Sequence, residues 1–223
     1  VLLRGIGADQ RLGFVLDRQD GIGHRQAVVQ RHPADTGAAF IGHQFKVVGL
    51  ATDDAAQGDQ GVELLGVGHG RPTSRTRFYQ DAVELVEKAP FVSDADTCLS
   101  IARVRPRPFE VTWMERHFKH TQVFLPLNHQ PYAVVVAPPT AGSLPELDAA
   151  RAFRFAGDCG FMMHLGTWHE FPFALQAAAD MVVILRNETN RNLDAVADGE
   201  AVGGDLEKRN MQRRFGISLR FAI

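Results

Sequence analysis

The sequence predicts a mainly β protein, built as an all-β barrel or a two-sheet jelly roll with few short helices. Short segments of strand character follow one another about every ten residues through the second half of the chain. Helical patterns are rare there. The connections are short, which favours a single compact domain over separate sheets.

Each strand is predicted from period-two alternation, or from an apolar run bounded by turn residues. In chain order, the predicted strands cover residues 98–104, 109–114, 121–127, 132–138, 150–156, 161–164, 171–176, 181–187 and 216–223. Residues 77–89 are ambiguous between a strand and a helical turn. Residues 205–214 are predicted to form a short helix with Asp205 as its N-cap.

The composition changes near residue 70. The first 70 residues hold 13 of the 21 glycines and contain no Ser, Asn, Met, Trp, Tyr or Cys. Within them, only 13–16, 38–50 and 62–68 have the apolar character of short strands. We therefore predict an atypical glycine-rich segment over 1–72, either disordered or not native coding sequence, and a β domain over 73–223.

Charge and hydropathy exclude several classes of protein. The chain has 24 basic and 26 acidic residues, a balance that argues against a nucleic-acid partner. It has no apolar run near the ~20 residues that a membrane-spanning helix needs, and its first residues lack the apolar core of a signal peptide. Two cysteines are too few for a disulfide framework. We expect a cytoplasmic protein without a membrane partner.

The first cluster of reactive side chains lies in MERHFKHTQVF, residues 114–124. Glu115 and His117 are two residues apart, so in a strand they point to the same side of the sheet. A short turn after His117 would return the chain so that Gln122 faces the same space. His120 is assigned to that turn and is left out of the predicted site.

The second cluster lies in FMMHLGTWHEFP, residues 161–172. Gly166 permits a tight bend, which places His164 before the bend and His169 at the start of the next strand. A barrel would bring these histidines to the first cluster inside an apolar cup. Trp168 is expected to pack there or to form a wall of the pocket.

Together the two clusters resemble the metal-binding motifs of cupins. Many cupins carry two histidines separated by one residue, then a carboxylate, and a further histidine after a glycine turn. Glu115, His117, Gln122 and His169 occupy these positions here, with Glu and Gln in place of a His and a Glu. The resemblance implies that these four residues hold a divalent metal, Ni, Mn or Zn, if a cofactor is bound at all.

A narrower resemblance covers about residues 98–186. In order and spacing, the segments 115–127, 131–138, 150–155, 164–175 and 180–185 are similar to the ureidoglycolate lyase family, formerly called ureidoglycolate hydrolase. This resemblance implies a cupin-like double-stranded β-barrel, or jelly roll, over 73–223. It also implies a carbon–nitrogen lyase of the amidine-lyase type, which splits ureidoglycolate into glyoxylate and urea in allantoin and purine catabolism.

The implied reaction needs a base for the substrate hydroxyl, an acid for the departing nitrogen and a cation for the carboxylate. The candidate catalytic residues are His117, His169, Glu115, Gln122 and His164, and the candidate substrate-binding residues are Arg116, Arg151 and Trp168. Between the two arginines the sequence does not choose. The alternatives are another metal-dependent cupin enzyme acting on a small acid and a non-catalytic ligand-binding cupin. A homodimer is expected, since many cupins dimerise.

Overall fold

The computed structural model describes residues 61–66, 76–85 and 88–222, together with the backbone of four short strands before residue 52. The chain divides into two compact units, Val1–His43 and Gln44–Ile223. In the first unit, the described part is an antiparallel hairpin of β1 (Val15–Gln19) and β2 (Arg25–Val29).

The larger unit is built mainly from antiparallel strands. In chain order, its elements are β3 (Gln44–Val48), β4 (Leu50–Ala51), β5 (Val62–Leu65), β6 (Thr76–Phe78), β7 (Val83–Leu85), β8 (Thr97–Val104), β9 (Glu110–Val111), β10 (Trp113–His117), β11 (Gln122–Pro126), β12 (Tyr132–Ala137), β13 (Arg151–Phe155), β14 (Gly160–Met163), β15 (Trp168–His169), β16 (Phe173–Ala174), β17 (Ala179–Arg186), α1 (Asn187–Val196), β18 (Ala201–Gly203), β19 (Leu206–Asn210), α2 (Met211–Phe215) and β20 (Ile217–Phe221).

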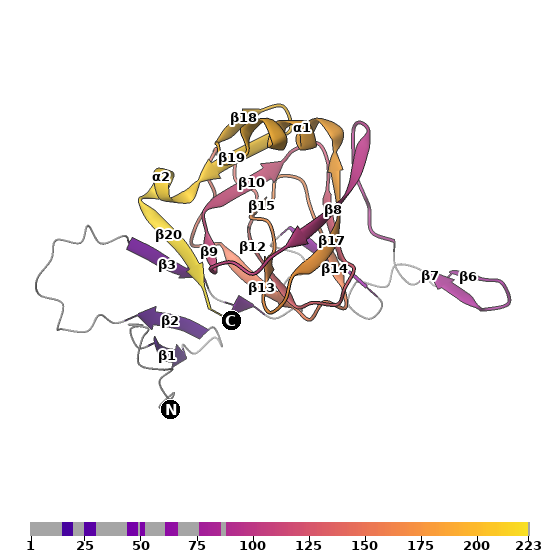
Figure 1. Cartoon of the computed structure of the whole chain (residues 1–223), viewed down its shortest axis with the longest axis horizontal. Helices are drawn as coiled ribbons and strands as arrows, with labels where there is room; N and C mark the ends of the chain where they lie inside the picture. The colour runs from indigo at the N-terminus through magenta and orange to yellow at the C-terminus, as the bar shows by residue number, and fades with distance from the viewer. Residues whose placement is uncertain are drawn as a thin grey trace, which may run out of the picture. The chain divides into compact units, whose positions relative to one another are not determined.

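Two sheets make up most of this unit (Figure 1). The larger has the order β18-β19-β10-β15-β12-β13-β4, with β16 also paired to β12. The smaller has the order β5-β14-β11-β17-β8. The described strands do not close into a continuous barrel, so the fold is a cupin-like arrangement of two sheets. The predicted mainly β class is confirmed.

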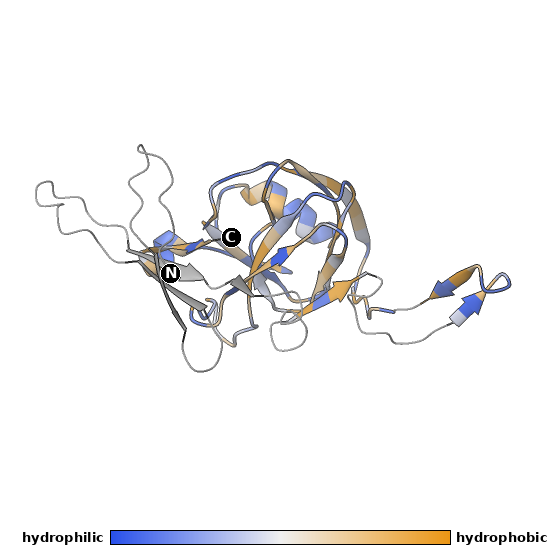
Figure 2. Ribbon diagram, turned by 90° about the horizontal axis from the view of Figure 1, so that it is seen from below, coloured by the Kyte–Doolittle hydropathy of each residue, from blue (hydrophilic) through white to orange (hydrophobic). Residues whose placement is uncertain are grey.

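Strand β12 is buried on both faces, as its continuous apolar sequence predicts. On one face, Tyr132 lies in the core between the two sheets, where its ring stacks on Phe155 at a centroid distance of 4.6 Å. On the other face, Val135 belongs to a second core, to which α2 and β20 contribute Met211 and Leu219. Figure 2 shows hydrophobic colouring along several strands of the larger unit. The central strand therefore ties the two cores together.

The predicted helix over 205–214 is wrong in its first half. Residues 206–210 form β19, which pairs antiparallel with β10, and only Met211–Phe215 is helical. The N-cap is Asn210, whose side chain accepts a hydrogen bond from the Arg213 amide. Pairing with a neighbouring strand outweighs the helical propensity of a charged segment.

Two further segments differ from a plain succession of strands. Residues 187–196 form helix α1, which the sequence analysis did not predict. The ambiguous residues 77–89 contain the hairpin of β6 and β7 rather than a helical turn. No helix in the described part of the chain is long and apolar enough to cross a membrane.

Part of the glycine-rich segment predicted over 1–72 contributes to the larger unit. Strand β5 pairs with β14, and its residues Val62 and Leu64 are buried in the core between the sheets. Strand β3 pairs with β20 in parallel. The two compact units divide after His43. Apart from the backbone of β1, β2 and β4, the rest of that segment lies outside the described residues.

Candidate functional site

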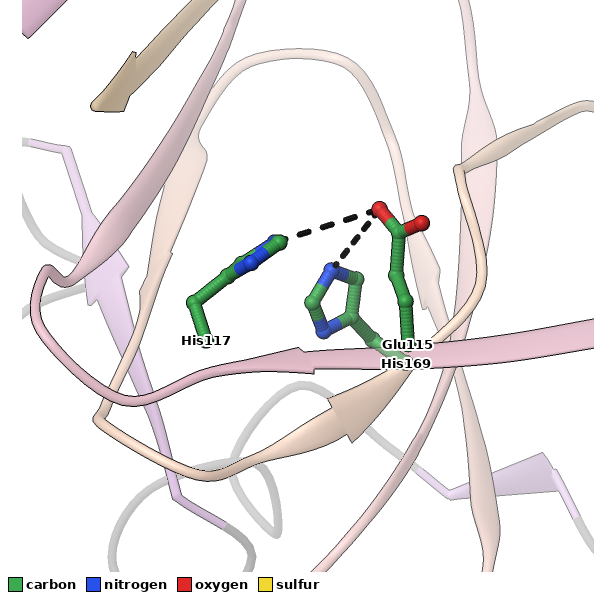
Figure 3. A group of neighbouring side chains, drawn as sticks. All are labelled: Glu115, His117 and His169. Atoms are coloured by element: carbon green, nitrogen blue, oxygen red, sulfur yellow. Dashed lines mark ion pairs between the residues drawn. The ribbon is translucent and has the colours of Figure 1, made fainter. Parts of the chain in front are cut away.

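Three of the predicted site residues lie together on the larger sheet. Glu115 and His169 are directly opposite each other where β10 pairs with β15, so their side chains share one face. His117 follows two residues later on β10 and points to the same side. Oε1 of Glu115 lies 3.9 Å from Nε2 of His117 and 3.7 Å from Nε2 of His169 (Figure 3).

The two imidazoles of this cluster are buried, and three of their four ring nitrogens lack a hydrogen-bond partner among the described residues. Both ring nitrogens of His117 and Nε2 of His169 have no hydrogen-bond partner among the described residues. The Glu115 side chain is only 12% exposed. Because native proteins rarely leave buried polar atoms unsatisfied, these atoms point to a bound ion, water or ligand.

The surroundings set the charge state of the cluster. Burial, reinforced by the neighbouring His169, lowers the pKa of His117 to about 3, so this imidazole is neutral at neutral pH. Burial raises the pKa of Glu115, but the adjacent His169 and His117 outweigh that effect and hold it below its ordinary value. An ionised carboxylate beside a neutral imidazole is the protonation state that a metal ion requires.

The orientation of His169 supports a cation at this position. Its Nδ1 lies 3.0 Å from the carbonyl oxygen of Thr167, which can only accept, so Nδ1 carries the proton. In the neutral ring, the lone pair of Nε2 then faces Glu115 Oε1. Two donor atoms that each lie about 2.0–2.2 Å from a metal ion are at most about 4.4 Å apart, so both measured distances fit one shared ion. The cluster can therefore hold a divalent metal.

His120 and Asp205 adjoin this cluster, and the sequence analysis assigned neither of them to the site. The His120 ring lies 4.7 Å from the His117 ring, and His120 Nδ1 lies 2.6 Å from Asp205 Oδ2. Asp205 also accepts from Thr189 Oγ1 and from the amides of Phe118 and Lys119. Both carboxylate oxygens are thus engaged, which makes Asp205 a support for His120 rather than a metal ligand.

Two other predicted residues lie outside the three-residue cluster. Gln122 is buried on β11 of the smaller sheet, and its Oε1 has no partner among the described residues. His164 has a side chain that is 47% exposed, and its Nε2 lies 3.6 Å from Glu63 Oε2 on β5. Gln122 therefore offers a free buried acceptor, whereas His164 pairs with a carboxylate.

The two candidate arginines are engaged elsewhere. Arg116 points to the opposite face of β10 from Glu115, where it pairs with Glu207 and lies over the Trp168 ring at 4.3 Å. Trp168 is completely buried in the second core and contributes to that packing. Arg151 shares the face of the cluster, but its guanidinium donates to the carbonyl oxygens of nearby backbone.

A model of the ureidoglycolate lyase family matches residues 73–203. The chain belongs to the ureidoglycolate lyase family. This confirms the resemblance that the motifs indicated. Glu115, His117 and His169 lie inside the matched region, whereas Asp205 lies just beyond it.

Curated members of the family give the same result. A ureidoglycolate lyase of Burkholderia mallei is 42% identical over 98 residues, which cover 43% of this chain and 56% of that protein. That of Azotobacter vinelandii is 34% identical over 125 residues, which cover 56% of this chain and 74% of that protein. The chain thus spans little more than half the length of the Burkholderia relative.

Proposed function

We propose that this chain is a carbon–nitrogen lyase of the amidine-lyase type, which cleaves ureidoglycolate to glyoxylate and urea in purine catabolism. The observation that carries the proposal is the buried cluster of Glu115, His117 and His169, with its unpartnered acceptor atoms. Its position inside the region that matches the family supports the choice of substrate.

The proposed reaction needs only proton transfer and bond cleavage. Ureidoglycolate carries a hydroxyl and a urea nitrogen on one carbon. Loss of the hydroxyl proton forms the carbonyl of glyoxylate, the carbon–nitrogen bond breaks, and the departing nitrogen takes up one proton to give urea. No oxidant, reductant or covalent nucleophile is required.

Glu115 is the proposed proton carrier. Its Oε1 faces the two imidazoles, which leaves Oε2 to take the hydroxyl proton and return it to the departing nitrogen. A carboxylate whose pKa lies below its ordinary value is ionised at neutral pH and can therefore act first as the base. Gln122 would orient the substrate by accepting a urea N–H at its unpartnered Oε1.

The proposed cofactor is a divalent Ni, Mn or Zn ion held by Glu115, His117 and His169. Such an ion supplies Lewis-acid polarisation of the oxygen that becomes the carbonyl of glyoxylate. His169 is prepared for this role, because the Thr167 carbonyl fixes the tautomer that leaves Nε2 free to bind. The predicted homodimer and cytoplasmic location are proposals as well. The homodimer rests on the resemblance to cupins, and the location on the low cysteine content.

The direct test is to incubate the purified protein with ureidoglycolate, with and without added Ni²⁺, Mn²⁺ or Zn²⁺. We expect urea and glyoxylate to appear in equal amounts. Absence of both products with folded, metal-loaded protein would contradict the proposal. Binding of small carboxylates without turnover would favour a ligand-binding cupin instead.

A further inference from the structure

Lys208 occupies the position next to Glu115 on the neighbouring strand. In the pairing of β10 with β19, Glu115 is directly opposite Lys208, and on its other side it is directly opposite His169. Opposed residues in a sheet share a face, so the three side chains form one row across three adjacent strands. The predicted site residues did not include Lys208, because only the strand register brings it to this row.

The charge of Lys208 is buried without a carboxylate partner. Three arginines are also buried in the described part of the chain, and each forms an ion pair with a carboxylate. They are Arg116, Arg186 and Arg209. Lys208 has no such partner within 4.0 Å among the described residues, although the residue is only 9% exposed. The ionised Glu115 acts on Lys208 from beyond ion-pair distance, so no carboxylate directly contacts this buried cation, and an anion that reached it would complete its environment.

The known contacts of Lys208 leave part of its ammonium group free. Its Nζ donates to the carbonyl oxygen of Ala197 at 2.5 Å and lies 5.0 Å from the centre of the Trp113 ring. An ammonium has three N–H donors, and one carbonyl uses only one of them. The charge also acts on Glu115, whose pKa Lys208 helps to lower.

We propose that Lys208 binds the carboxylate of the substrate. This inference rests on the proposed lyase function, since ureidoglycolate and glyoxylate each carry one carboxylate. Charge-assisted hydrogen bonds between an ammonium and a carboxylate are among the strongest in proteins. Arg116 is on the far face of β10, and Arg151 is separated from His169 by the strand that carries Val136. Lys208, by contrast, is adjacent to the proposed proton carrier.

A purely structural role for Lys208 predicts different behaviour. Ala197 is the C-cap of helix α1. In a purely structural role, the hydrogen bond from Lys208 Nζ to the Ala197 carbonyl oxygen would do no more than stabilise this end of the helix. In Figure 1, α1 and β19 lie at the same end of the larger unit. Removing a cap lowers the stability of the protein, whereas removing a substrate anchor raises KM and weakens binding of a carboxylate ligand.

The test compares three substitutions of Lys208. Lys208→Met removes the charge and the donor, Lys208→Gln keeps a donor for Ala197 but no charge, and Lys208→Arg keeps the charge. We measure KM and kcat for ureidoglycolate, binding of glyoxylate by calorimetry, and the thermal midpoint. Lys88→Met, at an exposed lysine, is the matched control for loss of one positive charge.

We expect Lys208→Met and Lys208→Gln each to raise KM, and to weaken glyoxylate binding, by at least about tenfold, and Lys208→Arg to recover most of the loss. Lys88→Met should change neither. Unchanged KM and glyoxylate affinity in folded Lys208→Gln would overturn the inference and leave the lyase proposal standing. If the wild type binds glyoxylate but does not turn over ureidoglycolate, the binding data alone decide the role of Lys208.

Discussion

Nε2 of His169 faces Oε1 of Glu115 at 3.7 Å, while Nδ1 of the same ring is turned to the Thr167 carbonyl. Two acceptors directed at each other inside a protein repel unless a cation or a donor lies between them. The pairing of β10 with β15 sets this arrangement, since it holds the two residues directly opposite each other. The site is therefore arranged for a positively charged or hydrogen-bond-donating occupant.

Loss of His169 should weaken metal binding. Removing an outer partner of a metal ligand typically costs about 10–100-fold in affinity, so removing a ligand should cost at least about 100-fold. We expect this loss for Zn²⁺ binding to His169→Ala, measured by calorimetry on metal-free protein. His129→Ala removes an exposed histidine in a turn and should leave the affinity unchanged. Equal affinities in the two variants would exclude His169 as a ligand.

Asp205 should contribute strongly to stability. Its carboxylate accepts four hydrogen bonds, from His120, Thr189 and the amides of Phe118 and Lys119. Asp205→Ala leaves these buried donors unpaired, and we expect a loss of about 3–5 kcal/mol in the free energy of unfolding in urea. The control substitution Thr189→Val removes only one of these hydrogen bonds, so it should lower the free energy of unfolding by about 1 kcal/mol. Similar losses in both variants would contradict a central role for the carboxylate.

The ion pair of Glu200 and Arg214 should make stability depend on pH in acid. The Arg214 guanidinium, aided by the Asn210 amide, lowers the pKa of Glu200 from 4.5 to about 2. A carboxylate with a lowered folded-state pKa stabilises the fold above its unfolded-state pKa, and this contribution is lost as pH falls. We expect Glu200→Gln to show a weaker loss of stability than the wild type between pH 4.5 and about 2. Parallel curves would refute this assignment.

Leu64 tests whether β5 is an integral part of the domain. Its side chain is almost fully buried between the two sheets, although it lies in the glycine-rich segment. Leu64→Ala should lower the free energy of unfolding by about 2–5 kcal/mol, because it leaves a cavity. Val202→Ala, at a residue that is 75% exposed, should change it by less than about 0.5 kcal/mol. No effect at Leu64 would place β5 outside the cooperative fold.

The features of the site that sequence reasoning recovered depend on short-range rules. Glu115 and His117 share a face because strand residues alternate, and His169 follows a glycine bend at Gly166 with positive φ. The apolar run of β12 also predicted a strand buried on both faces. In these cases the local pattern and the tertiary structure agree.

The features that were missed depend on long-range pairing. Asp205 meets His120 across 85 residues of sequence, and no local spacing predicts such a contact. Lys208 faces Glu115 only because the charged segment 206–210 pairs with β10, whereas its composition favours a helix. Alternation along β10 already places Arg116 on the face opposite Glu115, and only the identity of its partner Glu207 depends on the pairing of β10 with β19.

The central claim is that Glu115 carries the proton in cleavage of ureidoglycolate. The most direct measurement is the rate of urea release by the wild type and by Glu115→Gln, each loaded with the same metal to the same occupancy. Loss of a general base typically costs about 10²–10⁴-fold, so we predict a fall of that size in kcat with little change in the thermal midpoint. Urea release by Glu115→Gln at the wild-type rate would contradict the account.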